Sequence, residues 1–288
     1  WFRDEETRSS WPGLSRPSTS SFQTGHKDVD ARDERGHDGS HTDVILFADT
    51  FNRYFEPENL RAALTVLNAA GYRVIVATPN DGIPRPLCCG RTFLSVGRVD
   101  EAKREAERTL AALAPYLEWG VPILGLEPSC LFTFRDEIPA MLRTDAVKAA
   151  SSQTMLVEEF LAREAAENKL DLPLRATRKR ALLHGHCHQK AFGAMRAVET
   201  VLKLVPDLAV ETIESSCCGM AGAFGYAADT IDVSQAMAEL SLLPAVRKAE
   251  DDAIIVADGT SCRHQIHDGT GRDAVHVVRV LADSLAAN

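Results

Sequence analysis

The sequence contains no apolar run that approaches the roughly 20 residues of a membrane-spanning helix, and Trp1 to Ser20 lack the apolar core of a secretory signal peptide. It also lacks a basic excess, because 41 Asp and Glu outweigh 32 Lys and Arg and give a formal charge of −9. That balance argues against a surface that grips nucleic acid or anionic lipid. We therefore expect a cytoplasmic protein with no nucleic-acid partner and no membrane span.

The composition is that of an ordinary globular protein, with 45% hydrophobic and 25% charged residues among 288. This length corresponds to about two domains and excludes a small scaffold held together only by disulfides or metals. The seven cysteines are an odd number, so a fully paired disulfide framework is not expected in a chain without a secretory signal. Metal ligation or redox chemistry is favoured at Cys88, Cys89, Cys130, Cys187, Cys217, Cys218 and Cys262.

Composition and periodicity change near residue 43. Residues 1 to 42 are rich in Ser, Thr, Gly, Arg, Asp and His, which predicts a disordered tail or linker. Because the chain begins with Trp1 instead of methionine, we interpret it as a processed product or a segment of a longer polypeptide. From Asp43, short apolar runs alternate with helix-period segments, which indicates βα units. We expect strands at 44–47, 72–77, 121–126, 181–183, 208–213 and 253–257, and helices at 57–70, 98–118, 151–168 and 190–203.

An internal duplication relates two parts of the chain. Alignment of Leu46 with Leu183 brings three landmarks into the same order at separations that agree within eight residues. The equivalent positions, with their separations, are Thr50 and Cys187 (137), Cys88 and Cys217 (129), and Cys130 and Cys262 (132). We therefore predict an α/β fold of two duplicated βα lobes, residues 43–178 and 179–288, with mainly parallel sheets and the cysteine motifs at the carboxyl ends of strands.

Both halves contain the tripeptide Cys-Cys-Gly, at 88–90 and 217–219, followed 41 or 44 residues later by Ser-Cys. Ligands of open α/β sheets gather beyond the carboxyl ends of strands, and helix N-termini stabilise the negative charge of a thiolate-ligated iron–sulfur centre. Gly90 and Gly219 permit a backbone geometry that a Cβ would forbid and leave room for inorganic sulfide. The pattern thus favours a cluster site.

Three other interpretations of the cysteine pairs remain open. Free cysteines are often buried as small apolar residues, although two matched motifs make coincidence a minor alternative. Zinc also suits four soft ligands, but structural zinc sites usually space paired ligands by two to four residues. Adjacent cysteines can instead reach different irons of one cluster. A thiol–disulfide role would need partners from elsewhere in the fold, because neighbouring cysteines fit disulfide geometry poorly.

Histidines flank the cysteines of the second half, at His184, His186 and His188 around Cys187, and at His264 and His267 after Cys262. If the strand continues, alternation puts the first three on the side opposite Cys187, so not all can join it at one site. Hydrogen bonding or structural roles are favoured over direct ligation. His188 and His264 are the better candidates for contact with a cofactor.

Over about residues 43 to 285 the chain resembles the cysteine-rich "CCG" domain pair of iron–sulfur oxidoreductases. This family includes a cysteine-rich subunit of heterodisulfide reductase, the iron–sulfur subunits of glycolate oxidase and anaerobic glycerol-3-phosphate dehydrogenase, and the C-terminal part of fused FAD-linked oxidases that act on D-2-hydroxy acids. The chain shares most with the fused type, in the runs 47–57, 87–91, 127–130, 184–190 and 217–222.

The resemblance implies a module that takes electrons from a flavin through an iron–sulfur cluster, a [4Fe–4S] cluster where four cysteines are present. It implies FAD in a partner domain or subunit of 2-hydroxy-acid dehydrogenase type, and a ferredoxin-like domain, because neither an FAD-binding domain nor a Cys-x-x-Cys-x-x-Cys-x-x-x-Cys run is evident here. Peripheral attachment at the inner face of the membrane stays open. The alternative is a zinc-binding or thiol-redox docking module without a cluster.

The sequence departs from the family motif of a Cys after the first strand, a Cys-Cys pair and a closing Cys-x-x-Cys. Thr50 and Glu127 replace two of these cysteines in the first half, and Gly259 replaces one in the second. The second half keeps four cysteines and can ligate a [4Fe–4S] cluster alone, whereas three in the first half leave an open or non-cysteine position. That both halves contribute to one shared site is the other possibility.

Overall fold

The computed structural model describes residues 42–286. The predicted tail, residues 1 to 42, lies outside the described residues except for Thr42, which begins the first strand. The predicted division at residues 178 and 179 stays a proposal.

The first half of the described chain forms a four-stranded parallel sheet in the order β2-β1-β3-β4. Its strands are β1 (Thr42–Leu46), β2 (Tyr72–Val76), β3 (Ile123–Gly125) and β4 (Thr154–Leu156). β1 is central because its apolar run is fully buried, as parallel strands covered on both faces require. The helices are α1 (Thr50–Tyr54), α2 (Pro57–Ala69), α3 (Arg91–Ser95), α4 (Val99–Glu118), α5 (Pro128–Leu131), α6 (Glu137–Met141), α7 (Asp145–Gln153) and α8 (Val157–Ala166).

The second half forms another four-stranded parallel sheet, in the order β6-β5-β7-β8. Its strands are β5 (Arg180–His184), β6 (Ala209–Thr212), β7 (Ile254–Ala257) and β8 (Ala274–Val275). The helices are α9 (Cys187–Ala191), α10 (Met195–Leu202), α11 (Ile231–Glu239), α12 (Leu242–Lys248), α13 (Thr260–Thr270) and α14 (Val277–Ser284). In each half the first strand lies between the second and third, and the fourth adds beyond the third. The predicted α/β class with two parallel sheets is confirmed.

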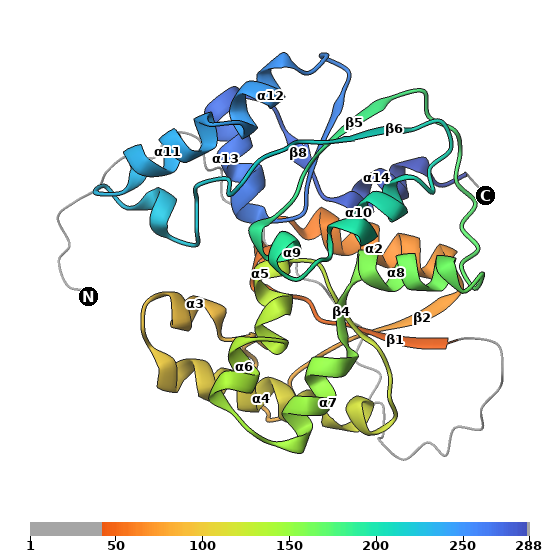
Figure 1. Cartoon of the computed structure of the whole chain (residues 1–288). Helices are drawn as coiled ribbons and strands as arrows, with labels where there is room; N and C mark the ends of the chain where they lie inside the picture. The colour runs from red at the N-terminus through yellow and green to blue at the C-terminus, as the bar shows by residue number, and fades with distance from the viewer. Residues whose placement is uncertain (1–41, 287–288) are drawn as a thin grey trace. The chain divides into compact units, whose positions relative to one another are not determined.

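The two halves pack on each other through helices. α2 contacts α14, and α10 contacts α8. Because α2 and α10 both follow the first strand of their half, and α8 and α14 both follow the last, the two contacts join equivalent elements of the duplicated halves. Figure 1 shows the four helices between the two sheets. One apolar cluster includes Leu46 of β1 and Leu183 of β5, so the core is continuous across the halves.

Two of the expected helices are wrong in extent. The helix expected at 151–168 is interrupted by β4, which pairs with β3 through Leu124 and Met155. β4 has only three residues, so it does not disturb the apolar period that α7 and α8 continue on either side. The helix expected at 190–203 is divided into α9 and α10 at Gly193, which has a φ of +71°.

Candidate metal centre

The four cysteines of the second half converge at one edge of its sheet. Cys187 begins α9 after β5, Cys217 and Cys218 follow β6, and Cys262 lies in the first turn of α13 after β7. These three strands are parallel, with β5 between the other two. Their carboxyl ends therefore meet, and the loops that leave them bring the four thiols together.

The four thiols interact with one another and are all free. Cys217 lies next to Cys187 and Cys218, and hydrogen bonds from these two thiols lower its pKa. A hydrogen bond from Cys218 also lowers the pKa of Cys262, against the opposing effect of burial. The group therefore favours thiolate at two of its members, and the thiolate is the form of cysteine that binds metals.

Lys190, on α9, brings a positive charge to this group. Its ammonium interacts with all four thiols and donates hydrogen bonds to the carbonyl oxygens of Ser215 and Ser216, the latter at 2.8 Å. Burial lowers the pKa of Lys190, and the neighbouring thiols oppose this effect. The ammonium of Lys190 therefore stabilises negative charge on the cysteine thiolates around it.

The glycine of each Cys-Cys-Gly motif adopts the left-handed conformation, with a φ of +86° at Gly90 and +95° at Gly219. A Cβ would lie 2.8 Å from the Ala102 carbonyl oxygen at Gly90, and 2.2 Å from that of Ser234 at Gly219. The Gly219 N–H donates to Cys217 Sγ at 3.3 Å, and the Gly90 N–H donates to Cys88 Sγ at 3.4 Å. The two loops thus share one geometry, which requires glycine.

The three cysteines of the first half form a smaller group. Cys89 lies beside both Cys88 and Cys130. The pKa of Cys130 is raised to about 12, since burial and the nearby carboxylates of Asp49 and Glu127 outweigh its hydrogen bond with Cys89. This raised pKa holds Cys130 as the neutral thiol, unlike its equivalent Cys262.

The two non-cysteine positions of the first half lie at helix N-termini. Thr50 begins α1, where Asp49 caps the helix by accepting from the N–H groups of Phe51 and Asn52. Glu127 accepts from the Ser129 hydroxyl at 2.6 Å through Oε1, and from the Thr260 N–H at 2.9 Å through Oε2. Both Glu127 oxygens are engaged in capping, so this residue is poorly placed to act as a metal ligand.

The two histidines expected to contact a cofactor differ in their surroundings. His188 is half-buried, its Nδ1 has no partner among the described residues, and burial lowers its pKa to about 4. His264 is also partly buried and faces the exposed Tyr226, whose hydroxyl lies 3.0 Å from its Nδ1. Ligand atoms of His188, His186 and Cys187 lie within 4.8 Å of one another, whereas His264 belongs to no such group among the described residues.

The other two histidines of the 184–188 run do not follow strand alternation, because β5 ends at His184. His186 caps α9 by accepting from the His188 N–H at 3.1 Å through Nδ1. His184 is fully buried, and one of its ring nitrogens lies within 4.8 Å of the sulfurs of Cys218 and Cys262. Nothing in the cysteine motifs favours His184 over its neighbours; the signal available in the sequence is a histidine at a position where the first half has Phe47.

The donors of the second half fit a thiophilic metal centre. Four thiols, two of them buried, meet with a cation and a buried imidazole, and no carboxylate belongs to the set. Thiolate and imidazole donors suit iron–sulfur clusters or zinc, whereas magnesium and calcium require oxygen donors. The first half offers three thiols and two carboxylates that are already engaged.

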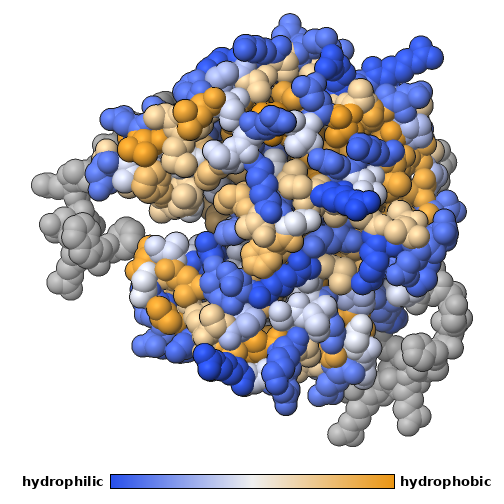
Figure 2. Space-filling model, viewed as in Figure 1, coloured by the Kyte–Doolittle hydropathy of each residue, from blue (hydrophilic) through white to orange (hydrophobic). Residues whose placement is uncertain are grey.

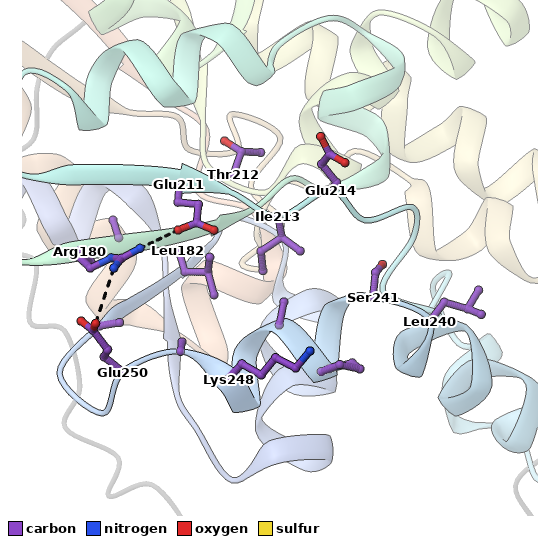
Figure 3. A pocket seen from close by; sticks show the side chains of 15 residues that line it. Arg180, Leu182, Glu211, Thr212, Ile213, Glu214, Leu240, Ser241, Lys248 and Glu250 are labelled. Atoms are coloured by element: carbon purple, nitrogen blue, oxygen red, sulfur yellow. Dashed lines mark hydrogen bonds and ion pairs between the residues drawn. The ribbon is translucent and has the colours of Figure 1, made fainter.

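A groove of about 720 Å³ lies elsewhere on the second half (Figure 3). Its wall includes the ion pairs of Arg180 with Glu211 and Glu250, and its lining contains none of the seven cysteines. This groove therefore does not belong to the candidate centre.

Comparison with known proteins agrees with the cysteine geometry. The family model described as "Cysteine-rich domain" (CCG) matches residues 181–267, which hold all four cysteines of the second half. The chain is 27% identical over 276 residues to a subunit of the anaerobic glycerol-3-phosphate dehydrogenase of Escherichia coli K12, covering 95% of this chain and 66% of that protein. The predicted resemblance to cysteine-rich CCG modules is confirmed.

Two further relatives are D-2-hydroxyglutarate dehydrogenase of Pseudomonas putida and lactate utilization protein A of Bacillus velezensis. The first is 27% identical over 240 residues, 83% of this chain and 22% of that protein. The second is 24% identical over 220 residues, 75% of this chain and 87% of that protein. The chain thus spans about two thirds of the glycerol-3-phosphate relative and about a fifth of the D-2-hydroxyglutarate relative. Within residues 42–286, no helix has the length and apolar character to cross a membrane.

Proposed function

Because residues 181–267 are a CCG cysteine-rich domain in a chain similar to parts of dehydrogenases, we propose that this protein is an electron-transfer module with an iron–sulfur centre. The observation that carries the proposal is the convergence of four thiols from three parallel strands. In this account electrons come from FAD in a dehydrogenase domain or subunit that oxidises a 2-hydroxy acid. They leave toward a ferredoxin-like domain.

We assign the centre to the second half, with Cys187, Cys217, Cys218 and Cys262 as the ligands of a [4Fe–4S] cluster. When bound, such a cluster supplies a one-electron carrier. The residues of the chain stabilise its negative charge: Lys190 provides an ammonium, and the first turn of α13 presents the positive end of a helix dipole to Cys262. The Gly219 N–H donates to a ligand sulfur, which tunes the potential of such centres.

The partner would approach between the halves. Cys187 and Cys217 are partly exposed, whereas Cys218 and Cys262 are buried, so access to the centre is from the first pair. Figure 2 shows the surface hollowed between the parts that carry α3 and α11 in Figure 1, with apolar residues on both sides. Exposed apolar side chains on these two parts of the chain include Val96, just after α3, and Tyr226 and Val233, before and on α11. Such a rim suits a protein partner.

The proposal is tested by reduction with a free flavin. Anaerobically purified protein should show the visible charge-transfer absorption of a thiolate-ligated cluster, and fully reduced flavin mononucleotide should bleach it by about one electron per chain. The apolar rim variant Tyr226→Ala serves as a control, because it leaves the ligands intact and should not affect reduction by a small donor. A colourless protein, or a chromophore that the reduced flavin leaves unchanged, would contradict the proposal.

A further inference from the structure

His184 has a buried ring nitrogen without a well-aligned hydrogen bond among the described residues. The side chain is fully buried at the end of β5, and its Nδ1 lies 2.8 Å from the Ser215 hydroxyl. Its Nε2 forms no well-aligned hydrogen bond in the part of the chain that the structure describes, although the ring interacts with the Cys262 thiol. A buried polar atom without a good partner is unfavourable, and a metal bound at Nε2 would supply one.

Ser215 and Lys190 orient the ring of His184. The Ser215 hydroxyl lies 2.8 Å from Nδ1 of His184, and Lys190 Nζ donates to the same hydroxyl oxygen at 3.4 Å. With Nδ1 held by this hydrogen bond, Nε2 is the ring nitrogen that can offer its lone pair to a metal.

Two cysteine sulfurs lie near this lone pair. The sulfurs of Cys218 and Cys262 and a ring nitrogen of His184 are all within 4.8 Å of one another, and all three residues are buried. Metal–sulfur and metal–nitrogen bonds are about 2.0–2.3 Å long, so small side-chain movements would bring these three atoms within reach of a metal. Because Nδ1 is engaged by Ser215, Nε2 is the nitrogen available to this group.

The first half provides an internal comparison. Phe47 occupies the position in the first half, just after β1, that His184 occupies in the second, and it packs edge-on against Phe134, with the ring centroids 5.3 Å apart. An apolar ring is thus sufficient for the fold at this place. The half with four cysteines replaces it with an imidazole, at the cost of burying polar atoms.

We propose that His184 is a fifth ligand of the centre, binding through Nε2 to an iron that already carries one of the two neighbouring thiolates, that of Cys218 or that of Cys262. This inference rests on the proposed function for the presence of iron, and otherwise on the geometry of His184 alone. A neutral imidazole adds no charge at this position, whereas a thiolate there would make the centre more negative and lower its reduction potential. The pair of Ser215 and Lys190 orients the ring.

Pulsed electron paramagnetic resonance on the reduced protein, labelled with ¹⁵N-histidine, tests the ligand directly. We expect a strong coupling to one histidine nitrogen in the wild type. It should persist in His188→Gln, the neighbouring half-buried histidine, and in His267→Asn, an exposed histidine of α13. It should vanish in His184→Cys, which keeps a ligand at the position so that the centre still assembles, with a more negative midpoint potential.

The possible results separate the two proposals. Iron and sulfide without a histidine coupling, or a coupling that survives in His184→Cys, would overturn the His184 ligand and leave the proposed function standing. Loss of the coupling in His188→Gln would assign the nitrogen to His188 and overturn it equally. A wild type without iron would contradict the proposed function, and the His184 inference would fall with it.

Discussion

Glu127 accepts a 2.9 Å hydrogen bond from the backbone N–H of Thr260, 133 residues later in the chain. Glu127 stands where the family motif has its first closing cysteine, and Thr260 begins α13, the helix that carries Cys262. Through its other oxygen Glu127 caps α5, which carries Cys130. One side chain therefore fixes the helices that present both closing cysteines. At Glu127, where the family motif has a cysteine, this chain therefore has a side chain that joins the two halves by a hydrogen bond.

Glu127→Ala should lower the free energy of unfolding by about 2 kcal/mol, because it removes a helix cap and leaves the Thr260 N–H buried without an acceptor. Chemical denaturation of the metal-free protein measures this change. Glu107→Ala, at an exposed site on α4, is the matched control and should change stability by less than about 0.5 kcal/mol. Equal stability of the two variants would contradict the role given to Glu127.

A buried ion pair also joins the halves. Arg263 is 4% exposed and pairs with Glu56, which also accepts from the Thr260 hydroxyl at 2.7 Å. Arg263→Met should destabilise the protein by about 3–5 kcal/mol, because it leaves the Glu56 carboxylate buried and unpaired. The double variant with Glu56→Met should recover part of that loss in a denaturation experiment.

An exposed pair on the same interface serves as the control for Arg263. Arg279 of α14 lies 3.7 Å from Glu58 of α2, with side chains 37% and 46% exposed. Arg279→Met should cost less than about 1 kcal/mol. A comparable loss for both arginines would show that burial does not decide the strength of these pairs.

Gly219→Ala should prevent assembly of the centre. The added Cβ would meet the Ser234 carbonyl oxygen, so the loop that holds Cys217 and Cys218 must move. Gly222→Ala is the matched control, because Gly222 also has a positive φ, of +69°, but a Cβ there would have no neighbour within 4 Å. We expect metal bound per chain to fall at least tenfold in the first variant and to stay near the wild-type value in the second. Equal metal content would contradict a backbone requirement at Gly219.

The pH dependence of stability should carry a contribution from Glu158. Burial, and then the nearby Asp258, raise the pKa of this carboxyl well above its usual 4.5. The folded state therefore holds the proton more tightly than the unfolded state, so this contribution is full below pH 4.5 and is lost as pH rises toward the folded pKa.

Glu158→Gln should remove that part of the pH dependence and increase stability near pH 8 relative to pH 5. The amide oxygen of the variant can still accept from Gln189, whose side-chain nitrogen lies 2.8 Å from Glu158 Oε1. Denaturation curves of both proteins from pH 5 to 8 measure the effect. Parallel curves for wild type and variant would refute the assignment.

Much of the fold follows from local patterns in the sequence, and the rest depends on distant contacts. The buried run at 44–46 and the Cys-Cys-Gly repeats predict parallel strands and their equivalence, because apolar periodicity and glycine requirements are local. The sequence did not predict β4, because a strand of three residues is too short to change the apolar helix periodicity around it. The hydrogen bond of Glu127 with Thr260 and the ion pair of Glu56 with Arg263 join residues more than 100 positions apart, and no local sequence pattern predicts them.

The same distinction applies to the site. The cysteines could be grouped from their spacing, because strand order determines which loops meet. The role proposed for His184 could not be assigned from the sequence, since it depends on the environment of its buried Nε2 and on Ser215, which is 31 residues away. The alternation argument for the histidines required the strand to continue through Cys187, and this condition is not met, because a helix begins there.

The iron–sulfur cluster proposed for the second half can be tested by the content of iron, acid-labile sulfide and zinc in anaerobically purified wild type, Cys262→Ser and Cys130→Ser. We predict about four irons and four sulfides per chain in the wild type and in Cys130→Ser, and a loss of both in Cys262→Ser. Zinc without iron in the wild type, or equal loss in the two variants, would contradict the account.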